Sequence, residues 1–503
     1  MDLNNIKRNQ LDYILTDMLP TELSERFTFF YFYEFLMTKR KELKQMNNFL
    51  ISVKNKYKTG IMFEGGGSGH GGHKGNNWVT MPLKYSIMKE LHTEREISLL
   101  QPIAAVELFA FVSIYQKELI NLLDMNSIFS LRHHHKNNEL CYKNKNKSIT
   151  KYFAVESAQI DKDLIEKTGM FFDIKPYKSI ASFTSSEEWL VLNSKYRYFI
   201  RTDYKACFDS IYTHTFKWLI GKDVNDTKDF KNTNIYTTID RILQNINART
   251  SNGIVVGPEF SRMIAEILLQ AIDRTVYSKL LNSGKAVGEN YNVYRFVDDI
   301  FIFAESEELA NEIVQIYSEI SAKYLLRLNE GKLYKNTVPF VLDEWVNGTS
   351  IFANRTSACL FRTKEEQEIW LQKEKQNSPE KEVVPHILKS RALYYSKRSI
   401  MNQLNELICE YPSKDRTIVA YFLGTILNKV SRNKENVKIF SEHVTEQTVA
   451  NFMDLIFYAY SFFPNYNNTQ RFLSIVSYIR DEYDIFTSSE QLQKLVNKYA
   501  FIF

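Results

Sequence analysis

Apolar positions between residues 196 and 340 alternate between the spacing of a strand and the spacing of a helix. The run YRYFIRTDY is β-prone and ends near Asp203, and apolar residues at helical spacing follow it. We therefore expect a strand that ends at Asp203, where a helix begins. A second helix is expected from about Pro258, because proline favours the first helical position. Its buried stripe is formed by Phe260, Met263, Ile264, Ile267, Leu268, Ala271 and Ile272.

The stretch YRFVDDIFIF, residues 294–303, predicts two strands that meet at a tight turn. Two adjacent aspartates, Asp298 and Asp299, occupy this turn inside an otherwise apolar run. Together with Asp203 they form a cage for hard divalent cations, because Mg²⁺ prefers oxygen ligands and keeps water and substrate phosphates in its shell. A solvated surface turn is the alternative interpretation, and the apolar residues on both sides argue against it.

Outside this central region the pattern is mostly helical. Residues 7–57 look helical and mixed in charge, and residues 79–135 predict strand followed by helix. From about residue 386 the chain consists of successive amphipathic helices, separated by YPSKD, RNKEN and PNYNN. Paired helices of this length suit a small HEAT-like α-solenoid, although no strict repeat is visible.

Two loops carry candidate phosphate-binding residues. Residues 64–77, EGGGSGHGGHKGNN, contain seven of the 17 glycines. Their backbone N–H groups, with His70, His73 and Lys74, could cradle an anion. A flexible connector is the alternative, and the G-K-[ST] ending of a Walker loop is missing. Residues 136–151 have five lysines against one glutamate, which suits either a path for phosphates or a plain solvated surface.

Composition narrows the class of protein. At 503 residues the chain is long enough for two or more domains, and its net charge of +5 is compatible with nucleic acid without proving it. The four cysteines have no C-x-x-C spacing, and the histidines at 133–135 would point to opposite faces of a strand, so neither predicts a metal site. The N-terminus has no apolar signal core, and residues 455–463 are too short to span a bilayer. We expect a cytoplasmic protein that does not associate with membranes.

The central segments, in this order, resemble the palm of reverse transcriptases. RTDYKACFDSI is similar to the first catalytic block, in which Asp203 is a metal ligand, and YRFVDD is similar to the [YF]-x-DD box. The resemblance implies that Asp203 and Asp298 hold catalytic Mg²⁺, with Mn²⁺ as an alternative ion, and that Asp299 assists. It covers roughly residues 80–345, and its motifs are specific as a set.

Four further residues receive nucleotide-binding roles through this resemblance. Gly257 lies in NGIVVGPEFSRMIAEI, which is similar to the glycine-bearing block beneath the incoming nucleotide. Phe208 falls at the position of the bulky steric gate, which implies deoxynucleotides as substrates. Lys332 in LNEGKLY, and Arg95 in the fingers-like segment REISLLQP, are implied to face the triphosphate.

The chain is most similar to the abortive-infection and defence-associated branch of bacterial reverse transcriptases, the unknown-group enzymes. Val255 and Val256 stand where other branches have proline and glutamine, which leaves ordinary template handling open. The branch implies a HEAT-like helical region in place of a normal thumb, a tyrosine hydroxyl as primer and a role in phage defence. Tyr13 and Tyr57 are candidate primers because they precede the fingers, and ordinary packing is the alternative for both.

The expected fold is α+β: reverse-transcriptase fingers and palm, as in a right-hand polymerase, followed by an all-α helical-repeat domain. The boundaries are 1–195 for N-terminal helices and fingers, 196–345 for the palm and 346–503 for the helical domain. We expect a Mg²⁺-dependent DNA polymerase that uses dNTPs, forms a homo-oligomer and makes single-stranded DNA attached covalently to the protein.

Two alternative functions remain. One is a templated reverse transcriptase that copies a partner non-coding RNA into cDNA. The other is a degenerate polymerase that acts as a binding or oligomer-forming sensor. Retention of all three carboxylates argues against the sensor, because degenerate palms tend to lose them.

Overall fold

The computed structural model describes residues 10–20, 29–38, 79–90, 93–124, 128–141, 170–221, 234–342, 344–377, 384–431, 437–483 and 490–502. The chain divides into two compact units. The first comprises Met1–Tyr85, Glu96–Lys143 and Lys162–Phe340, and the second comprises Ser86–Arg95, Asn144–Asp161 and Val341–Phe503. Each unit has a hydrophobic core of its own.

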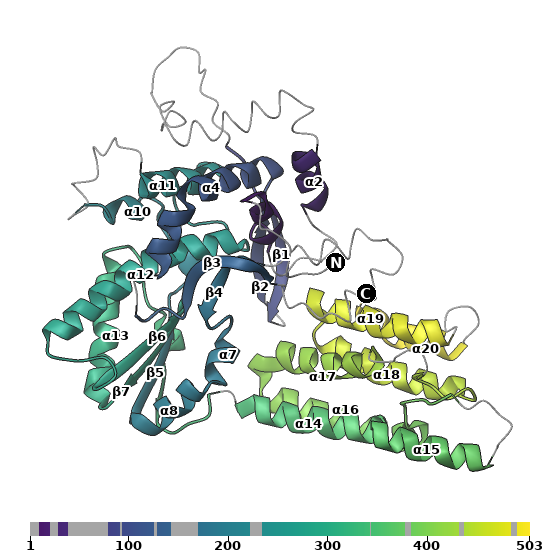
Figure 1. Ribbon diagram of the computed structural model, residues 1–503. Helices are drawn as coiled ribbons and strands as arrows, with labels where there is room; N and C mark the ends of the chain where they lie inside the picture. The colour runs from purple at the N-terminus through teal and green to yellow at the C-terminus, as the bar shows by residue number, and fades with distance from the viewer. Residues whose placement is uncertain are drawn as a thin grey trace. The chain divides into compact units, whose positions relative to one another are not determined.

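The centre of the first unit is a four-stranded antiparallel sheet with the order β6-β7-β5-β8 (Figure 1). Its strands are β5 (Tyr198–Asp203), β6 (Tyr291–Phe296), β7 (Asp299–Ala304) and β8 (Tyr334–Thr337). Strands β6 and β7 form the predicted hairpin, and β5 ends at Asp203 as predicted. The pairing of β5 with β7 places Asp203 directly opposite Asp299.

Both faces of this sheet are covered, which explains why β7 is apolar at almost every position. On one face Ile200, Ile300 and Ile302 belong to the main core of the unit. On the other face the rings of Phe199 and Phe303 pack against Trp189. A strand that is buried on both sides has a nearly continuous apolar run instead of the alternation of a half-exposed strand.

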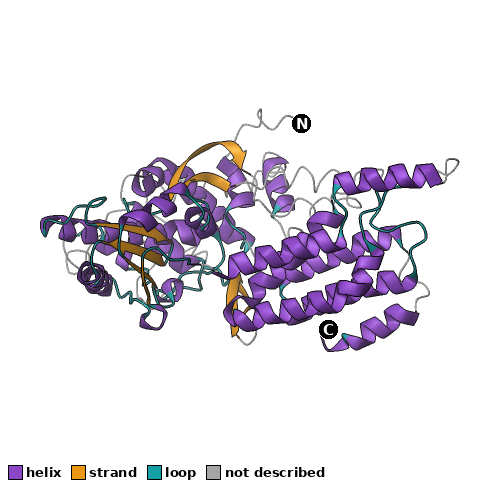
Figure 2. Ribbon diagram, turned by 90° about the horizontal axis from the view of Figure 1, so that it is seen from below, coloured by secondary structure: helices purple, strands orange, loops and turns teal. Residues whose placement is uncertain are grey.

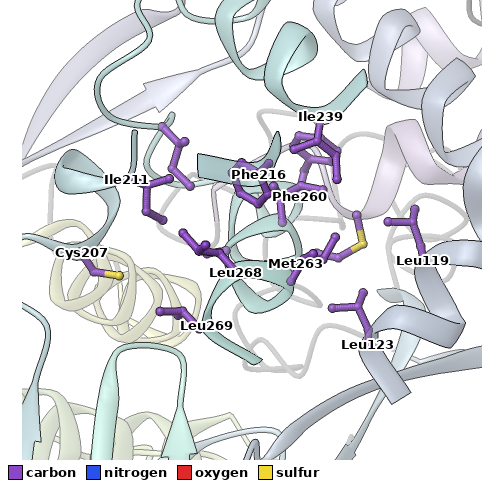
Figure 3. Close-up of a cluster of buried hydrophobic side chains, with 14 of the residues drawn as sticks. Leu119, Leu123, Cys207, Ile211, Phe216, Ile239, Phe260, Met263, Leu268 and Leu269 are labelled. Carbon is purple, nitrogen blue, oxygen red and sulfur yellow. The ribbon is translucent and has the colours of Figure 1, made fainter. Parts of the chain in front are cut away.

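The main core packs between helices of the first unit. Figure 3 shows Leu119 and Leu123 of one helix facing Met263 of another, with Phe260 and Phe216 close by. The helices involved are α4 (Pro102–Asp124), α10 (Thr215–Trp218), α11 (Ile235–Asn245), α12 (Glu259–Asn282) and α13 (Glu307–Ala322). The predicted stripe of α12 is buried throughout, and Pro258 is the N-cap of this helix.

The helix expected directly after Asp203 is interrupted, which corrects the prediction. Two short pieces take its place: α9 (Cys207–Ser210) and α10. Between them the backbone pairs with residues far along the chain, because Thr213 N donates to Ser251 O at 2.8 Å and Gly253 N donates to Ile211 O at 2.9 Å. These long-range hydrogen bonds replace the local ones that would have continued the helix.

The chain also forms two small sheets and several short helices. A two-stranded sheet is formed by β1 (Leu83–Glu90) and β2 (Thr93–Leu99), and another by β3 (Arg132–Cys141) and β4 (Met170–Pro176). Near the N-terminus the described elements are helical, in agreement with the prediction: η2 (Gln10–Asp12), α1 (Tyr13–Thr16) and α2 (Phe30–Thr38). The further short helical segments of the first unit are α7 (Ile180–Thr184), α8 (Glu187–Lys195) and η5 (Glu330–Lys332).

From residue 344 onward every described element of the second unit is helical (Figure 2). These elements are α14 (Glu344–Leu360), α15 (Lys364–Asn377), α16 (Ser390–Glu410), η6 (Pro412–Lys414), α17 (Asp415–Val430), α18 (Glu446–Phe462), α19 (Tyr466–Glu482), α20 (Glu490–Lys498) and η7 (Ala500–Ile502). Their core includes stacked rings, such as Tyr460 on Phe472. A HEAT-like repeat stays a prediction. In the described residues, no helix combines the length and the apolarity needed to cross a membrane.

Candidate active site

The three predicted carboxylates come together at one end of the sheet. Asp203 is the last residue of β5, and Asp299 is the first residue of β7. Asp298 lies in the turn between β6 and β7, directly after Val297, which has a φ of 56°. A β-branched residue rarely adopts positive φ, so this turn is strained. Such strain needs surrounding contacts to hold it.

Asp203 is 8% exposed and has two differently placed oxygens. Oδ2 accepts a hydrogen bond from Lys332 Nζ at 2.6 Å. Oδ1 is buried and has no hydrogen-bond partner among the described residues. A buried carboxylate oxygen without a partner is costly, so this atom needs a cation or a donor that the described residues do not supply.

Lys332 lies beside Asp203, and its predicted contact with the triphosphate stays a prediction. Its hydrogen bond to Asp203 raises the pKa of the ammonium group, and Asp299 and Asp298 add to this effect. The side chain is 60% exposed, so it can leave Asp203 for another anion at little packing cost.

Asp299 is held by a residue that the sequence analysis missed. Arg201 donates to Asp299 Oδ1 from Nε at 3.1 Å and from Nη2 at 2.8 Å. The same guanidinium lies over the Phe301 ring, 5.5 Å from its centroid. A signal was available, because Arg201 is two residues before Asp203 and alternate residues of a strand share a face.

Asp298 is the least compensated carboxylate of the three. Burial and the nearby charges of Asp299 and Asp203 together raise its pKa to about 6, against the opposing effect of Lys332. Like charges this close disfavour ionisation of all three groups together. A divalent cation bound here would instead favour the ionised form of all three carboxylates.

The fit of these residues to divalent metal ions depends on the donors that they offer. Within the described part of the chain, no group of three or more His, Cys, Asp or Glu side chains is arranged to hold a metal. Asp203 and Asp299 instead contact Lys332 and Arg201. The donor chemistry nevertheless fits a hard cation, because Asp203 Oδ1 has no partner among the residues that the structure describes and Asp298 is crowded by negative charge. Asp203 and Asp298 would be the ligands.

Phe208 lies in α9, five residues after Asp203, and is half-buried against the main core. Its carbonyl accepts a hydrogen bond from Ile254 N at 2.8 Å. This bond ties the candidate steric gate to the glycine-bearing loop that precedes α12. Its role in sugar selection stays a prediction.

Gly257 has a structural reason to be glycine. Its φ is +129°, and a Cβ atom there would lie 2.7 Å from Pro20 Cγ and 2.9 Å from Ile97 Cγ2. Both the backbone conformation and the packing therefore exclude a side chain. Its predicted place beneath the nucleotide stays a prediction.

The structure does not test the roles of the other predicted residues. Arg95 is exposed on β2 and belongs to the second unit, so its place at the triphosphate stays a prediction. Tyr13 is fully buried, so its hydroxyl does not reach solvent in this structure. Tyr57, residues 64–77 and most of the lysine-rich loop lie outside the described residues.

Several solved structures are remotely similar to the chain. Telomerase from Candida albicans, with a TWJ fragment of telomeric RNA, has 10% identity and a TM-score of 0.30, covering 76% of this chain and 64% of that one. The Candida tropicalis counterpart has 11% identity and a TM-score of 0.28, covering 76% and 62%. This chain thus spans slightly less than two thirds of either telomerase. Apo telomerase from Candida tropicalis has 12% identity and a TM-score of 0.31, covering 90% and 73%.

No curated protein matches the chain. Residues 134–346, which contain all three aspartates, Phe208, Gly257 and Lys332, match the family model described as reverse transcriptase (RNA-dependent DNA polymerase). The chain therefore contains a reverse transcriptase domain, and this domain supports a nucleotidyltransferase of the RNA-directed DNA polymerase type.

Proposed function

We propose that this protein synthesises DNA from dNTPs in a Mg²⁺-dependent reaction, with Asp203 and Asp298 as the metal ligands. The observation that carries the proposal is the uncompensated pair formed by Asp203 Oδ1, which has no partner in the described residues, and Asp298, whose pKa is raised to about 6 by burial and neighbouring carboxylates. Bound metal ions supply activation of the attacking hydroxyl and stabilisation of the leaving pyrophosphate.

The remaining residues orient the substrate. Lys332 is exposed enough to turn from Asp203 to the triphosphate, where its charge would offset that of the phosphates. Phe208 would occupy the space of a 2′-hydroxyl and so favour deoxynucleotides. Arg201 keeps Asp299 paired, so that this carboxylate assists by its charge more than by direct coordination.

Incorporation of labelled dNTPs by the purified protein tests this function. Asp298→Asn keeps the size of the side chain and removes the charge, so it should reduce incorporation by several orders of magnitude while the protein stays folded. Glu289→Gln, a surface substitution in the same unit, is the matched control and should leave the rate unchanged. A folded Asp298→Asn variant with a near wild-type rate would contradict the assignment.

We further propose that the protein belongs to the abortive-infection branch and primes synthesis from one of its own tyrosines. The motif resemblance supports this proposal, and it implies single-stranded DNA joined to the protein, a homo-oligomer and a role in phage defence. Incubation without added primer tests it. Label that stays with the denatured protein supports protein priming, and label found only in free DNA contradicts it.

A second candidate is templated synthesis on a non-coding RNA, favoured by the family model, whose description is RNA-dependent DNA polymerase. Sequencing of the product separates the two. A fixed sequence complementary to a co-purified RNA supports templated copying. A random or homopolymeric product supports synthesis without a template.

A further inference from the structure

The guanidinium of Arg295 is buried next to the catalytic turn. Arg295 lies on β6, two residues before Val297, and its side chain is 0% exposed. Nη1 and Nη2 donate to the two oxygens of Glu266 at 2.9 and 3.0 Å. Nε donates to both oxygens of Asp273 at 3.1 and 2.9 Å, and Nη2 donates to Oδ2 of Asp273 at 2.8 Å. The remaining N–H of Nη1 donates to the carbonyl oxygen of Val297 at 2.8 Å.

The two carboxylates come from α12, seven residues apart, so they share one face of the helix. Burial alone would raise the pKa of Glu266, but Arg295, with smaller contributions from Arg132 and His134, lowers the pKa overall and keeps the group ionised. Other donors complete the cluster: Ser130 Oγ donates to Glu266 at 2.9 Å, and Tyr317 Oη donates to Asp273 at 3.0 Å. The bonds from Arg295 to Glu266, Asp273 and Val297 use all five N–H groups of the guanidinium.

The bond to Val297 gives this cluster a connection to the active site. Val297 holds its unfavourable φ of 56° immediately before Asp298. Its carbonyl is fixed by Arg295, and the next carbonyl, that of Asp298, accepts from Tyr204 N at 3.3 Å. The turn is thus held on one side by the buried arginine and on the other by the residue that follows Asp203. Both bonds act on the peptide units that aim the Asp298 side chain.

We propose that Arg295 is a positioning residue for the reaction: anchored to α12 through Glu266 and Asp273, it holds the Val297 carbonyl and so fixes the direction of Asp298 toward Asp203. The inference rests on the proposed function, because that function makes Asp298 the residue to be positioned. A purely structural arginine would need only the two carboxylates. The additional bond to the strained turn is what carries the positioning role.

The test separates positioning from folding. Removing Arg295 alone would leave two buried carboxylates without this counter-charge, which is strongly destabilising. The triple variant Arg295→Met, Glu266→Gln, Asp273→Asn leaves no unpaired charge and keeps similar volumes. Tyr317→Phe is the matched control, because it removes a hydrogen bond to Asp273 and leaves the arginine and its bond to Val297 in place.

Two measurements are made on the full-length protein: the affinity for Mn²⁺ alone, by electron paramagnetic resonance, and the kinetics of dNTP incorporation. In the triple variant we expect Mn²⁺ affinity to fall about tenfold or more and kcat to fall about 100-fold, with KM for dNTP changed less than about threefold, because a small displacement of a catalytic group costs rate more than binding. Tyr317→Phe should stay within about twofold of wild type in both.

A folded triple variant with wild-type Mn²⁺ affinity and kcat would overturn the inference. If the triple variant does not fold, Arg295→Lys keeps a buried charge but cannot contact both carboxylates and Val297 together, and it carries the same expectation and the same refuting result. Wild-type protein that binds Mn²⁺ without incorporating dNTPs would contradict the proposed polymerase function. The order of Mn²⁺ affinities among the variants would still decide the role of Arg295.

Discussion

Gly257→Ala should destabilise the first unit by an amount that can be worked out from its surroundings. A residue with a side chain at φ +129° costs about 1–3 kcal/mol in backbone strain. The new Cβ would also lie 2.7 Å from Pro20 Cγ and 2.9 Å from Ile97 Cγ2, and overpacking of this kind costs about 1–3 kcal/mol. Alanine also lowers the conformational entropy of the unfolded chain, which offsets only about 0.4–1 kcal/mol of this destabilisation. We expect a net loss of about 1–6 kcal/mol in the free energy of unfolding.

Gly284→Ala is the matched control. Gly284 also has a positive φ, +75°, but a Cβ there would meet nothing within 4 Å. This variant therefore carries backbone strain without the clash and should lose about 1 kcal/mol or less. Hydrogen exchange of the β7 amides under increasing urea reports the opening of the first unit. If the two variants lose equal stability, the contacts with Pro20 and Ile97 do not explain why residue 257 is glycine.

Three further predictions address the gate, the paired aspartate and pH. Phe208→Ala should raise the ratio of rNTP to dNTP incorporation, and an unchanged ratio would make Phe208 a core residue only. Arg201→Ala should raise the affinity for Mn²⁺ several-fold, because it removes a competing cation from Asp299; calorimetric titration that shows no change would contradict this. Burial lowers the pKa of His134 to about 4, below the usual 6.5, so stability should fall as pH drops from 6.5 toward 4, by about 2 kcal/mol at pH 5. His134→Leu should remove this part of the pH dependence in urea unfolding, whereas a profile unchanged from wild type, or an equal effect in the control His133→Leu, would refute it.

The hairpin and the end of β5 were predictable because their signals are local. Alternating and continuous apolar runs mark the strands, and the two aspartates mark the turn. The interruption after Ser210 was not predictable in this way, because the hydrogen bonds that cause it come from residues 251–254. The apolar residues near Phe208 have helical spacing. This spacing indicates which side chains are buried, but it does not indicate which residues the backbone hydrogen-bonds to.

The buried arginine illustrates a second limit. Arg295 stands in an apolar strand, where a charged residue is usually read as an exposed position. Its partners, Glu266 and Asp273, lie within the helix whose apolar stripe was predicted, and nothing local connects them to β6. The periodicity of a sequence predicts single helices and strands, whereas this cluster depends on how β6 and α12 pack against each other.

The direct pairing of Asp203 with Asp299 has a consequence for how the domain tolerates change. The two backbone positions are joined by the hydrogen-bond ladder of the sheet, so the spacing of these carboxylates is independent of loop length. Insertions in the loops that precede β5 or follow β7 should therefore be accommodated without moving the charges. A single residue inserted within either strand would instead turn one carboxylate to the opposite face of the sheet, toward the main core that contains Ile200, Ile300 and Ile302.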